Sequence, residues 1–304
     1  MKWSRINWYK YKSLAIYVKL LSTLHLINKN SKIQHTKRKY LIKSVSNTKL
    51  ISETAGAAHT LYHPNKTQEE VKSIKKYLNE LIEECEFRKL DNSKIIIWAR
   101  EIMNSNYISN DEIQENKSKW DPNINRLDEL YKVLKERTSI RSVKKQNFNK
   151  ELIYRLISSA IEAPSSCNKQ SWRFVIVEDS KKIEEISRIK KQPFIKNFPY
   201  IIVCCFDKES YKGLDYEMTP YLDCGGAIMN LVNSATAIGL ASCWCNFTIK
   251  NTGTKAHNHL RKLIKLSKNI IPVSIVCVGV PQKINKKPTR EDLKFYMPYE
   301  DKKI

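Results

Sequence analysis

Three residues with the chemistry of a phosphate clamp lie close together in the middle of the chain. Arg137 and Arg141 are four residues apart, so at a helix end they project from one side, and Ser139 adds a hydroxyl donor between them. Guanidinium groups make paired, charge-assisted hydrogen bonds to phosphate oxygens. The spacing therefore predicts a site for a phosphate monoester, although an isolated R-x-S-x-R segment is more often a solvated helix end.

A second segment has the composition of a loop that holds a flat ring. A helical pattern stops at a proline, small polar residues follow, and an apolar run then indicates a strand at 172–177. The loop residues of interest are Pro164, Ser165, Ser166, Asn168 and Gln170. Asparagine and glutamine side chains both donate and accept, as the edge of a heterocycle requires. The alternative is a capped turn before a strand.

These two segments and three later ones resemble the ordered motifs of the FMN-dependent nitroreductase family. The later motifs are Gly239-Leu240-Ala241-Ser242-Cys243-Trp244, Gly279-Val280-Pro281 and Lys286-Lys287-Pro288. The order of the motifs makes the resemblance specific. It covers roughly residues 126–298 and does not extend to the first 125 residues.

The resemblance implies an FMN site and assigns residues to it. The phosphate would be held by Arg137, Ser139, Arg141 and Lys286; the flavin ring and its ribityl chain by Pro164, Ser165, Ser166, Asn168 and Gln170; flavin N5 and O4 would face main-chain groups of Cys245 and Asn246. Lys286, Ser171 and Asn246 depart from the family's usual residues at these positions. Asn246 leaves the substrate preference open, and Cys245 leaves open thiol chemistry near the flavin.

The activity implied by the resemblance is that of an oxidoreductase. NADH or NADPH would reduce FMN, and a small organic acceptor (a nitro compound, quinone, enone or biosynthetic intermediate) would reoxidise it in a ping-pong cycle. We assign no catalytic side chain, because the cofactor carries the electrons and the protein supplies orientation and hydrogen bonds. The resemblance also implies a homodimer with FMN at the subunit interface.

Other chemistries and compartments are not favoured. No paired carboxylates, Ser-His-Asp order or P-loop stands out, and the six histidines and eight cysteines lack metal-ligand spacing. We therefore expect no metal site. Most cysteines lie in apolar runs, which is typical of buried thiols in a reducing compartment and predicts a cytoplasmic protein.

The positive charge is concentrated at the N-terminus. The formal net charge is +23, and the first 50 residues hold twelve of the 54 basic residues and no acidic residue. The apolar part of this segment, residues 14–27, is too short and too charged to span a bilayer, and no cleavage site follows it. The segment could lie on an anionic membrane surface as an amphipathic helix, or pack on this protein or a second subunit.

An alternative function follows from that basic segment. The protein could be a flavin-fold binding or scaffold protein that its N-terminus localises, peripherally, to a membrane surface. A nucleic-acid role is not favoured, because no recognition helix or aromatic RNA-binding signature is visible.

Patterning predicts two domains. Residues 1–125 form a basic, mainly helical extension, in which 28–66 would be linker or loosely ordered, a capping box of Thr67 and Glu70 starts a helix through Phe87, and a second helix covers 95–103. Residues 126–304 form the FMN-binding domain.

The second domain is expected to be α+β. Its expected elements are helices starting after Asn125 and Asn149, strand 172–177, helix 180–189, strand 200–206, helix 221–238 capped by Gly239, strand 241–245, helix 255–266 and strand 273–278. This order agrees with the nitroreductase-like three-layer fold that the resemblance implies, in which helices flank a central, mostly antiparallel sheet.

Overall fold

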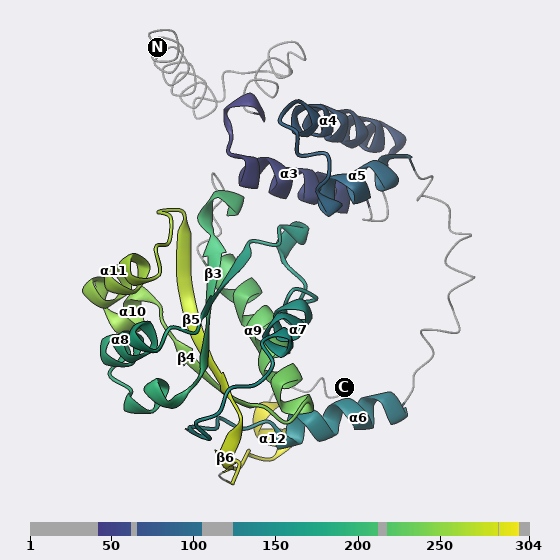
Figure 1. Cartoon of the computed structure of the whole chain (residues 1–304). Helices are drawn as coiled ribbons and strands as arrows, with labels where there is room; N and C mark the ends of the chain where they lie inside the picture. The colour runs from purple at the N-terminus through teal and green to yellow at the C-terminus, as the bar shows by residue number, and fades with distance from the viewer. Residues whose placement is uncertain (1–41, 62–65, 105–123, 212–217, 285, 298–304) are drawn as a thin grey trace, which may run out of the picture.

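The structure consists of a helical unit followed by an α+β domain (Figure 1). It is a computed structural model that describes residues 42–61, 66–104, 124–211, 218–284 and 286–297. The basic N-terminal segment that could form an amphipathic helix, with its apolar part at residues 14–27, lies outside these ranges. The predicted domain boundary at residue 125 stays a prediction.

The helical unit contains α3 (Asn47–Thr60), α4 (Gln68–Phe87) and α5 (Lys94–Asn104). The three helices share a core of their own, formed by Ile42, Leu50, Ala57, Ala58, Leu78, Leu81, Ile82, Cys85, Ile96 and Ala99. The capping box before α4 is confirmed, since the side chains of Thr67 and Glu70 each accept a hydrogen bond from the other residue's backbone N–H. The helix expected at 95–103 is confirmed as α5.

The prediction of loose structure through residue 66 is wrong for α3. Its hydrophobic periodicity is weak because polar side chains occupy buried positions. Thr54 is fully buried and donates to the Leu50 carbonyl oxygen (2.9 Å), while buried Ser52 donates to the Lys169 carbonyl oxygen (3.2 Å). Burying a polar side chain costs little free energy when the side chain has a hydrogen-bond partner. Serine and threonine can therefore occupy buried positions of α3, where a search for regularly spaced apolar residues does not detect the helix.

A four-stranded sheet forms the middle layer of the second domain. Its strands are β2 (Trp172–Val177), β3 (Tyr200–Asp207), β5 (Ile270–Gly279) and β4 (Ala241–Asn246), in the order β2-β3-β5-β4. Every neighbouring pair is antiparallel. All eight residues of β3 are buried, as in a strand covered on both faces.

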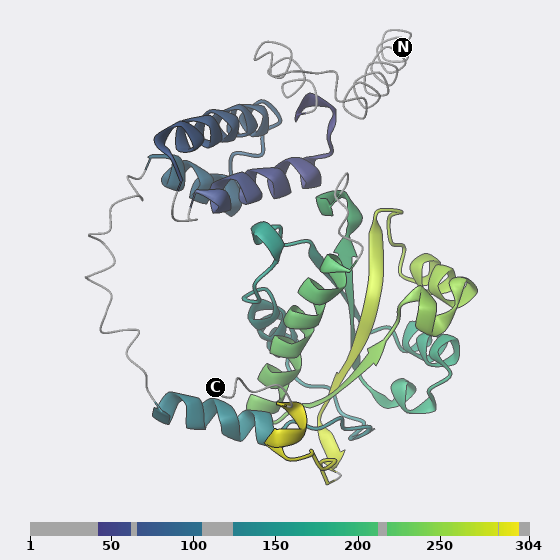
Figure 2. The same ribbon diagram turned by 180° about the vertical axis from the view of Figure 1, so that it is seen from behind.

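Helices cover both faces of this sheet, as the views from the front and from behind show (Figures 1 and 2). One face packs on α7 (Glu151–Ala160) and α9 (Thr219–Ala237), and the other on α8 (Ser180–Lys190) and α11 (Thr254–Leu263). The predicted three-layer α+β fold with an antiparallel sheet is therefore confirmed.

The side chains of β3 alternate between the two faces of the sheet and contribute to the hydrophobic core on each face. Ile202 and Cys204 point into the cluster with α7 and α9, whereas Ile201, Val203 and Cys205 point into the cluster with α8 and α11. Successive side chains of a strand face opposite sides, so one apolar run serves two layers.

Most predicted elements of this domain occur within a few residues of their expected bounds. Gly239 adopts the expected left-handed conformation (φ 75°), and Asn149 accepts a hydrogen bond from the backbone N–H of Glu151 (2.9 Å). Asn125 lies inside α6 (Ile124–Glu136) instead of preceding it. The elements that the pattern did not predict are the short pair β1 (Ser142–Val143) and β6 (Pro281–Lys283), the four-residue helices α10 (Ile249–Thr252) and α12 (Leu293–Tyr296), and several 3-10 turns.

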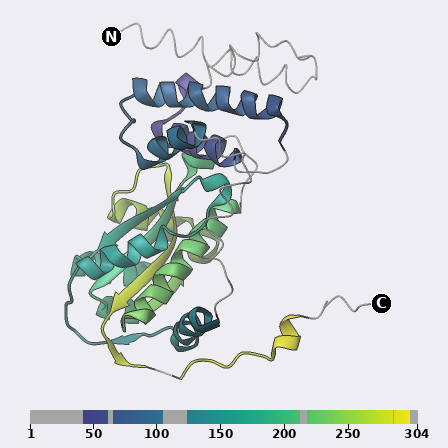
Figure 3. The same ribbon diagram turned by 90° about the vertical axis from the view of Figure 1, so that its right-hand side faces the viewer.

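The helix α6 touches α9 but carries apolar side chains that the described residues leave exposed. None of its side chains is buried, and Ile124, Leu127, Leu130 and Tyr131 are all at least half exposed. After β6 the chain runs away from the domain toward α12, whose Phe295 is also exposed (Figure 3). Among the described residues, no helix combines the length and apolar composition needed to cross a membrane.

Candidate functional site

The predicted ring-binding loop has a strained backbone. It lies between α7 and β2 and contains the 3-10 helix η2 (Ser166–Asn168). Cys167, Asn168 and Gln170 have left-handed φ values of 49°, 52° and 46°. Non-glycine residues in this region cost on the order of 1–3 kcal/mol each and persist only where the surroundings impose the conformation.

Hydrogen bonds within the loop bring its polar side chains together. The Ser165 hydroxyl oxygen accepts from the backbone N–H of Gln170 (2.9 Å), and the Gln170 amide donates to Asn168 Oδ1 (2.9 Å). The backbone N–H of Asn168 donates to the Ser165 carbonyl oxygen (2.9 Å). Pro164 is exposed at the start of the loop. The predicted loop residues thus form one compact polar turn.

A buried carboxyl group on α9 anchors the start of this loop. Both Asp223 oxygens accept from the backbone N–H of Ser166 (3.2 and 3.3 Å), and Oδ2 also accepts from the Tyr211 hydroxyl. Burial raises the pKa of Asp223, against the lowering effect of these two hydrogen bonds. No motif predicted this residue, although a single acidic residue on the buried face of an apolar helix is a usable signal.

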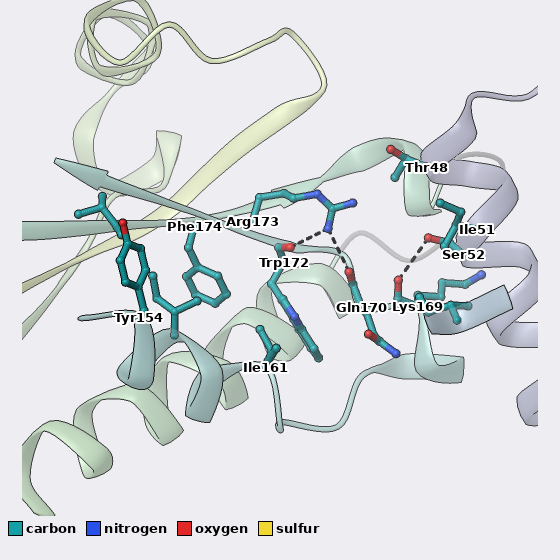
Figure 4. Close-up of a pocket in the computed structure, with 13 residues that line it drawn as sticks. Thr48, Ile51, Ser52, Tyr154, Ile161, Lys169, Gln170, Trp172, Arg173 and Phe174 are labelled. Carbon is teal, nitrogen blue, oxygen red and sulfur yellow. Dashed lines mark hydrogen bonds between the residues drawn. The ribbon is translucent and has the colours of Figure 1, made fainter. Parts of the chain in front are cut away.

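The helix α3 holds the other end of the loop. Besides the bond from Ser52 to the Lys169 carbonyl oxygen (Figure 4), the Lys169 ammonium lies 3.4 Å from a Glu53 oxygen, which Lys49 also contacts at 2.5 Å. Lys169 is only 5% exposed. No short-range pattern predicts the two contacts of Lys169, because Ser52 and Glu53 are more than 110 positions away from it.

A cavity of about 540 Å³ opens between α3, α5, α7 and β2 beside the loop (Figure 4). Its lining is mostly apolar and consists of Thr48, Ile51, Ser52, Ile95, Tyr154, Ile157, Ile161, Lys169, Gln170, Trp172, Arg173, Phe174 and Ile176. The Arg173 guanidinium in this lining donates to the carbonyl oxygens of Gln170 (3.1 Å) and Trp172 (2.7 Å). Arg173 thus ties the end of the loop to the first residue of β2.

The predicted phosphate clamp is only partly assembled. Arg137 and Ser139 line a second cavity of about 440 Å³, which we call the arginine pocket, together with Met229, Val232, Ser242, Trp244 and Asn246. A bond from the Ile140 N–H to the Ser242 carbonyl oxygen (3.0 Å) fixes this segment on β4. Arg141 does not line the pocket; it is exposed, and its guanidinium lies 5.6 Å from the centre of the Phe194 ring.

A neighbouring lysine extends the positive charge of the arginine pocket. Lys286 is exposed, whereas half-buried Lys287 donates to the Leu134 carbonyl oxygen (2.6 Å). Partial desolvation and the positive charges of Arg137 and Arg290 lower the pKa of Lys287. Adjacent cations that repel one another are suited to an anion, so Lys287 joins Lys286 as a candidate phosphate contact.

The end of β4 places Asn246 in the arginine pocket and Cys245 in the core. Asn246 is exposed, and its Oδ1 accepts from the Ser274 hydroxyl (3.4 Å). The contact with Cys243 lowers the pKa of the buried Cys245 thiol, but Cys277 and burial outweigh it and raise the pKa to about 12. A protonated, buried thiol is a poor nucleophile, which argues against thiol chemistry at this position.

One chain keeps the loop and the arginine pocket apart. The loop leads into Trp172, which pairs with Phe206, whereas Ser242 of the pocket pairs with Val278 and, through it, Tyr200. Tyr200 and Phe206 are six residues apart on β3, or about 20 Å at the usual rise of a strand. Asn246, at the other end of the pocket, pairs with Ser274 and, through it, with Cys204, so the width of the sheet separates this end from the loop, three strand spacings or about 14 Å. Among the described residues, none from 164–170 lines the arginine pocket.

An antiparallel sheet between helical layers, with a cationic pocket near one end and a polar, strained loop at the other, agrees with the class of flavin-dependent oxidoreductases. A family model described as the nitroreductase family matches residues 134–192 and 186–280. This part of the chain belongs to the nitroreductase family, as the motifs indicated. The match begins after the helical unit, so α3, α4 and α5 lie outside it.

Similar proteins agree with this assignment. An Archaeoglobus fulgidus protein, provisionally named NADH dehydrogenase/NAD(P)H nitroreductase, is 29% identical over 51% of this chain and 87% of its own length. The FMN reductase [NAD(P)H] of Bacillus subtilis is 26% identical over 53% of this chain and 70% of its own length. The solved structure of B. megaterium NfrA1 covers 57% of this chain and 74% of its own, with a TM-score of 0.50 and 21% identity, a likeness that concerns the fold.

Proposed function

We propose that this chain is an oxidoreductase that uses bound FMN to transfer electrons from NADH or NADPH to a small organic acceptor in a ping-pong cycle. The family assignment and the names of the two relatives support an NAD(P)H-dependent flavin enzyme. The observation that carries the proposal is the arginine pocket, which combines Arg137 and Ser139 with Asn246.

The residues present fit such a cofactor. Arg137, Ser139 and the lysines at 286 and 287 offer charged and hydroxyl donors to a phosphate group. The polar turn around Asn168 and Gln170 offers donors and acceptors to a ring edge. FMN, when bound, supplies the electron transfer itself, and the protein orients it and excludes water.

We further propose that the active form is a homodimer whose second copy brings its loop to the arginine pocket. The separation of loop and pocket along the sheet supports this, because one chain alone does not surround a flavin with all the predicted residues. The uncovered apolar face of α6, with Leu127 and Leu130, also supports it, since such a face is normally buried in an interface. Leu222 and Met229 on α9 are exposed apolar side chains as well.

FMN reconstitution tests the proposal. Purified protein should acquire flavin absorbance bands, and NADH or NADPH should bleach them. Arg137→Ala removes charge-assisted hydrogen bonds worth about 1.5–3 kcal/mol, so FMN affinity should fall roughly 10- to 100-fold. Arg188→Ala is the matched control, because Arg188 is exposed and pairs with two glutamates of its own helix, Glu184 and Glu185 on α8, away from both cavities. Protein that stays colourless in excess FMN would refute the proposal, and reoxidation by a panel of acceptors would identify the substrate class.

The compartment belongs to the same proposal. All eight cysteines are unpaired, and Cys167 alone among them is exposed, which supports a reducing compartment such as the cytoplasm. The alternative scaffold role at a membrane surface depends mainly on residues 1–41, which lie outside the described ranges, and it stays a prediction. Deleting these residues and measuring salt-sensitive adsorption to anionic vesicles tests it.

A further inference from the structure

The helix α3 makes specific contacts with the strained loop, although it lies outside the nitroreductase match. It also packs against η4 (Lys208–Tyr211), the turn that carries Tyr211, the hydrogen-bond partner of Asp223. Two of the groups that hold the loop, Ser52 and Glu53, therefore come from a segment that precedes the family domain.

The contacts concentrate on one loop residue, Lys169. The Ser52 hydroxyl donates to its carbonyl oxygen (3.2 Å), and Glu53 pairs with its ammonium (3.4 Å). Lys169 has an ordinary right-handed φ of −71°, but Asn168 and Gln170 on either side are left-handed. Left-handed non-glycine residues persist only where their surroundings impose the conformation, and the contacts from α3 to Lys169 add to the hydrogen bonds within the loop.

We propose that α3 is a positioning element for the flavin loop, in which Ser52 and Glu53 fix Lys169 and thereby hold Asn168 and Gln170 in their left-handed conformations. This inference rests on the proposed function, because it takes 164–170 as the loop that contacts FMN. In this proposal Ser52 and Glu53 are positioning residues, because they act on the loop through Lys169.

The charges around Glu53 make the contact between α3 and the loop sensitive to a single substitution. Two ammonium groups, those of Lys49 and Lys169, share this one carboxylate, and both lysines are less than a tenth exposed. Burial raises the pKa of Glu53, but its hydrogen bond to Lys49 and the charge of Lys169 outweigh that effect and lower it, so the carboxylate is ionised at neutral pH. Neutralising Glu53 would leave two buried cations side by side, which repel one another.

The test compares three variants of the full chain. Glu53→Gln should open the loop, Lys169→Met should have a smaller effect because Glu53 keeps Lys49 as its partner, and the double variant should recover part of the loss because the second cation is gone. Glu184→Gln removes an exposed glutamate that is paired with Arg188 on α8, and it is the matched control. Far-UV circular dichroism establishes that each variant is folded.

Two readouts separate positioning from general stability. Hydrogen exchange of the amides of 165–170 should be faster in Glu53→Gln than in Glu184→Gln. The FMN dissociation constant of Glu53→Gln should rise about 10-fold, which corresponds to the free energy of one charge-assisted hydrogen bond. Ser52→Ala, which changes no charge, should speed exchange in the same amides. Should Glu53→Gln fail to fold, Ser52→Ala decides the outcome by the same readouts.

The outcomes are distinguishable. Unchanged loop exchange in Glu53→Gln and Ser52→Ala overturns the inference. Faster exchange with unchanged FMN affinity also overturns it, because the helix would then hold the loop without positioning the flavin. If the wild-type protein binds no FMN, the proposed function fails, and with it the flavin role of the loop, while loop exchange still reports whether α3 holds these residues.

Discussion

Replacing Asp223 by alanine tests how strongly a buried carboxyl group organises the loop. The change leaves the backbone N–H of Ser166 and the Tyr211 hydroxyl without their acceptor. Losing the hydrogen bond from the Tyr211 hydroxyl, in a residue only 6% exposed, costs about 1–3 kcal/mol, and losing the bond from half-buried Ser166 adds a value near the low end of that range. The free energy of unfolding should fall by about 2–4 kcal/mol.

Asp223→Asn is the matched control, because it also removes the charge. Its amide oxygen still accepts from Ser166, and the Tyr211 hydroxyl can rotate to accept from the amide nitrogen. We expect this variant to lose less than about 1 kcal/mol. Urea unfolding followed by circular dichroism should rank the wild type and Asp223→Asn above Asp223→Ala. Equal unfolding midpoints for the two variants would refute the hydrogen-bond reasoning.

The pKa of Asp223 adds a pH signature. Because burial raises it in the folded state, the folded protein holds a proton over a range in which the unfolded chain has lost it. The free energy of unfolding should therefore decrease as the pH rises from the ordinary aspartate value through the raised one. Asp223→Asn should lack this slope.

Three further predictions concern other sites. A Cβ at Gly279 would approach Val143 Cγ1 to 3.1 Å, so Gly279→Ala should lower the free energy of unfolding by about 1–3 kcal/mol in urea titrations, and an unchanged midpoint would contradict the packing. Burial lowers the pKa of His257, so stability should be lost as the pH falls below the ordinary histidine value near 6.5, and His257→Gln should flatten this dependence in thermal melts. Lys287→Ala should weaken FMN binding more than Lys286→Ala in fluorescence titrations, because Lys287 is half-buried and lies close enough to Arg137 for the two charges to interact, whereas Lys286 is exposed; the reverse order would restore Lys286 as the phosphate contact.

The domain's elements were predictable because their signals are local. The apolar run of β2 gave the bounds 172–177, which the structure reproduces, and Gly239 marked the end of α9 through its left-handed conformation. The helix α3 was missed because its buried serine and threonine are stabilised by hydrogen bonds, which leave no apolar period.

The site was predictable only where neighbouring residues in the chain form it. Arg137 and Ser139 share a pocket, as their spacing indicated, and the loop side chains converge. The partners of the loop, Asp223 and Glu53, come from distant segments, and a single sequence holds no signal that joins them to Ser166 or Lys169.

The separate core of α3, α4 and α5 has a consequence for the order of folding. All its buried residues lie between Ile42 and Ala99, so its contacts are local and form fast, and this unit leaves the ribosome before the loop does. The folded unit of α3, α4 and α5 then already positions Ser52 and Glu53 when Lys169 is synthesised. We expect the strained loop at 165–170 of the nascent chain to adopt its left-handed conformations by packing against α3, which has folded earlier.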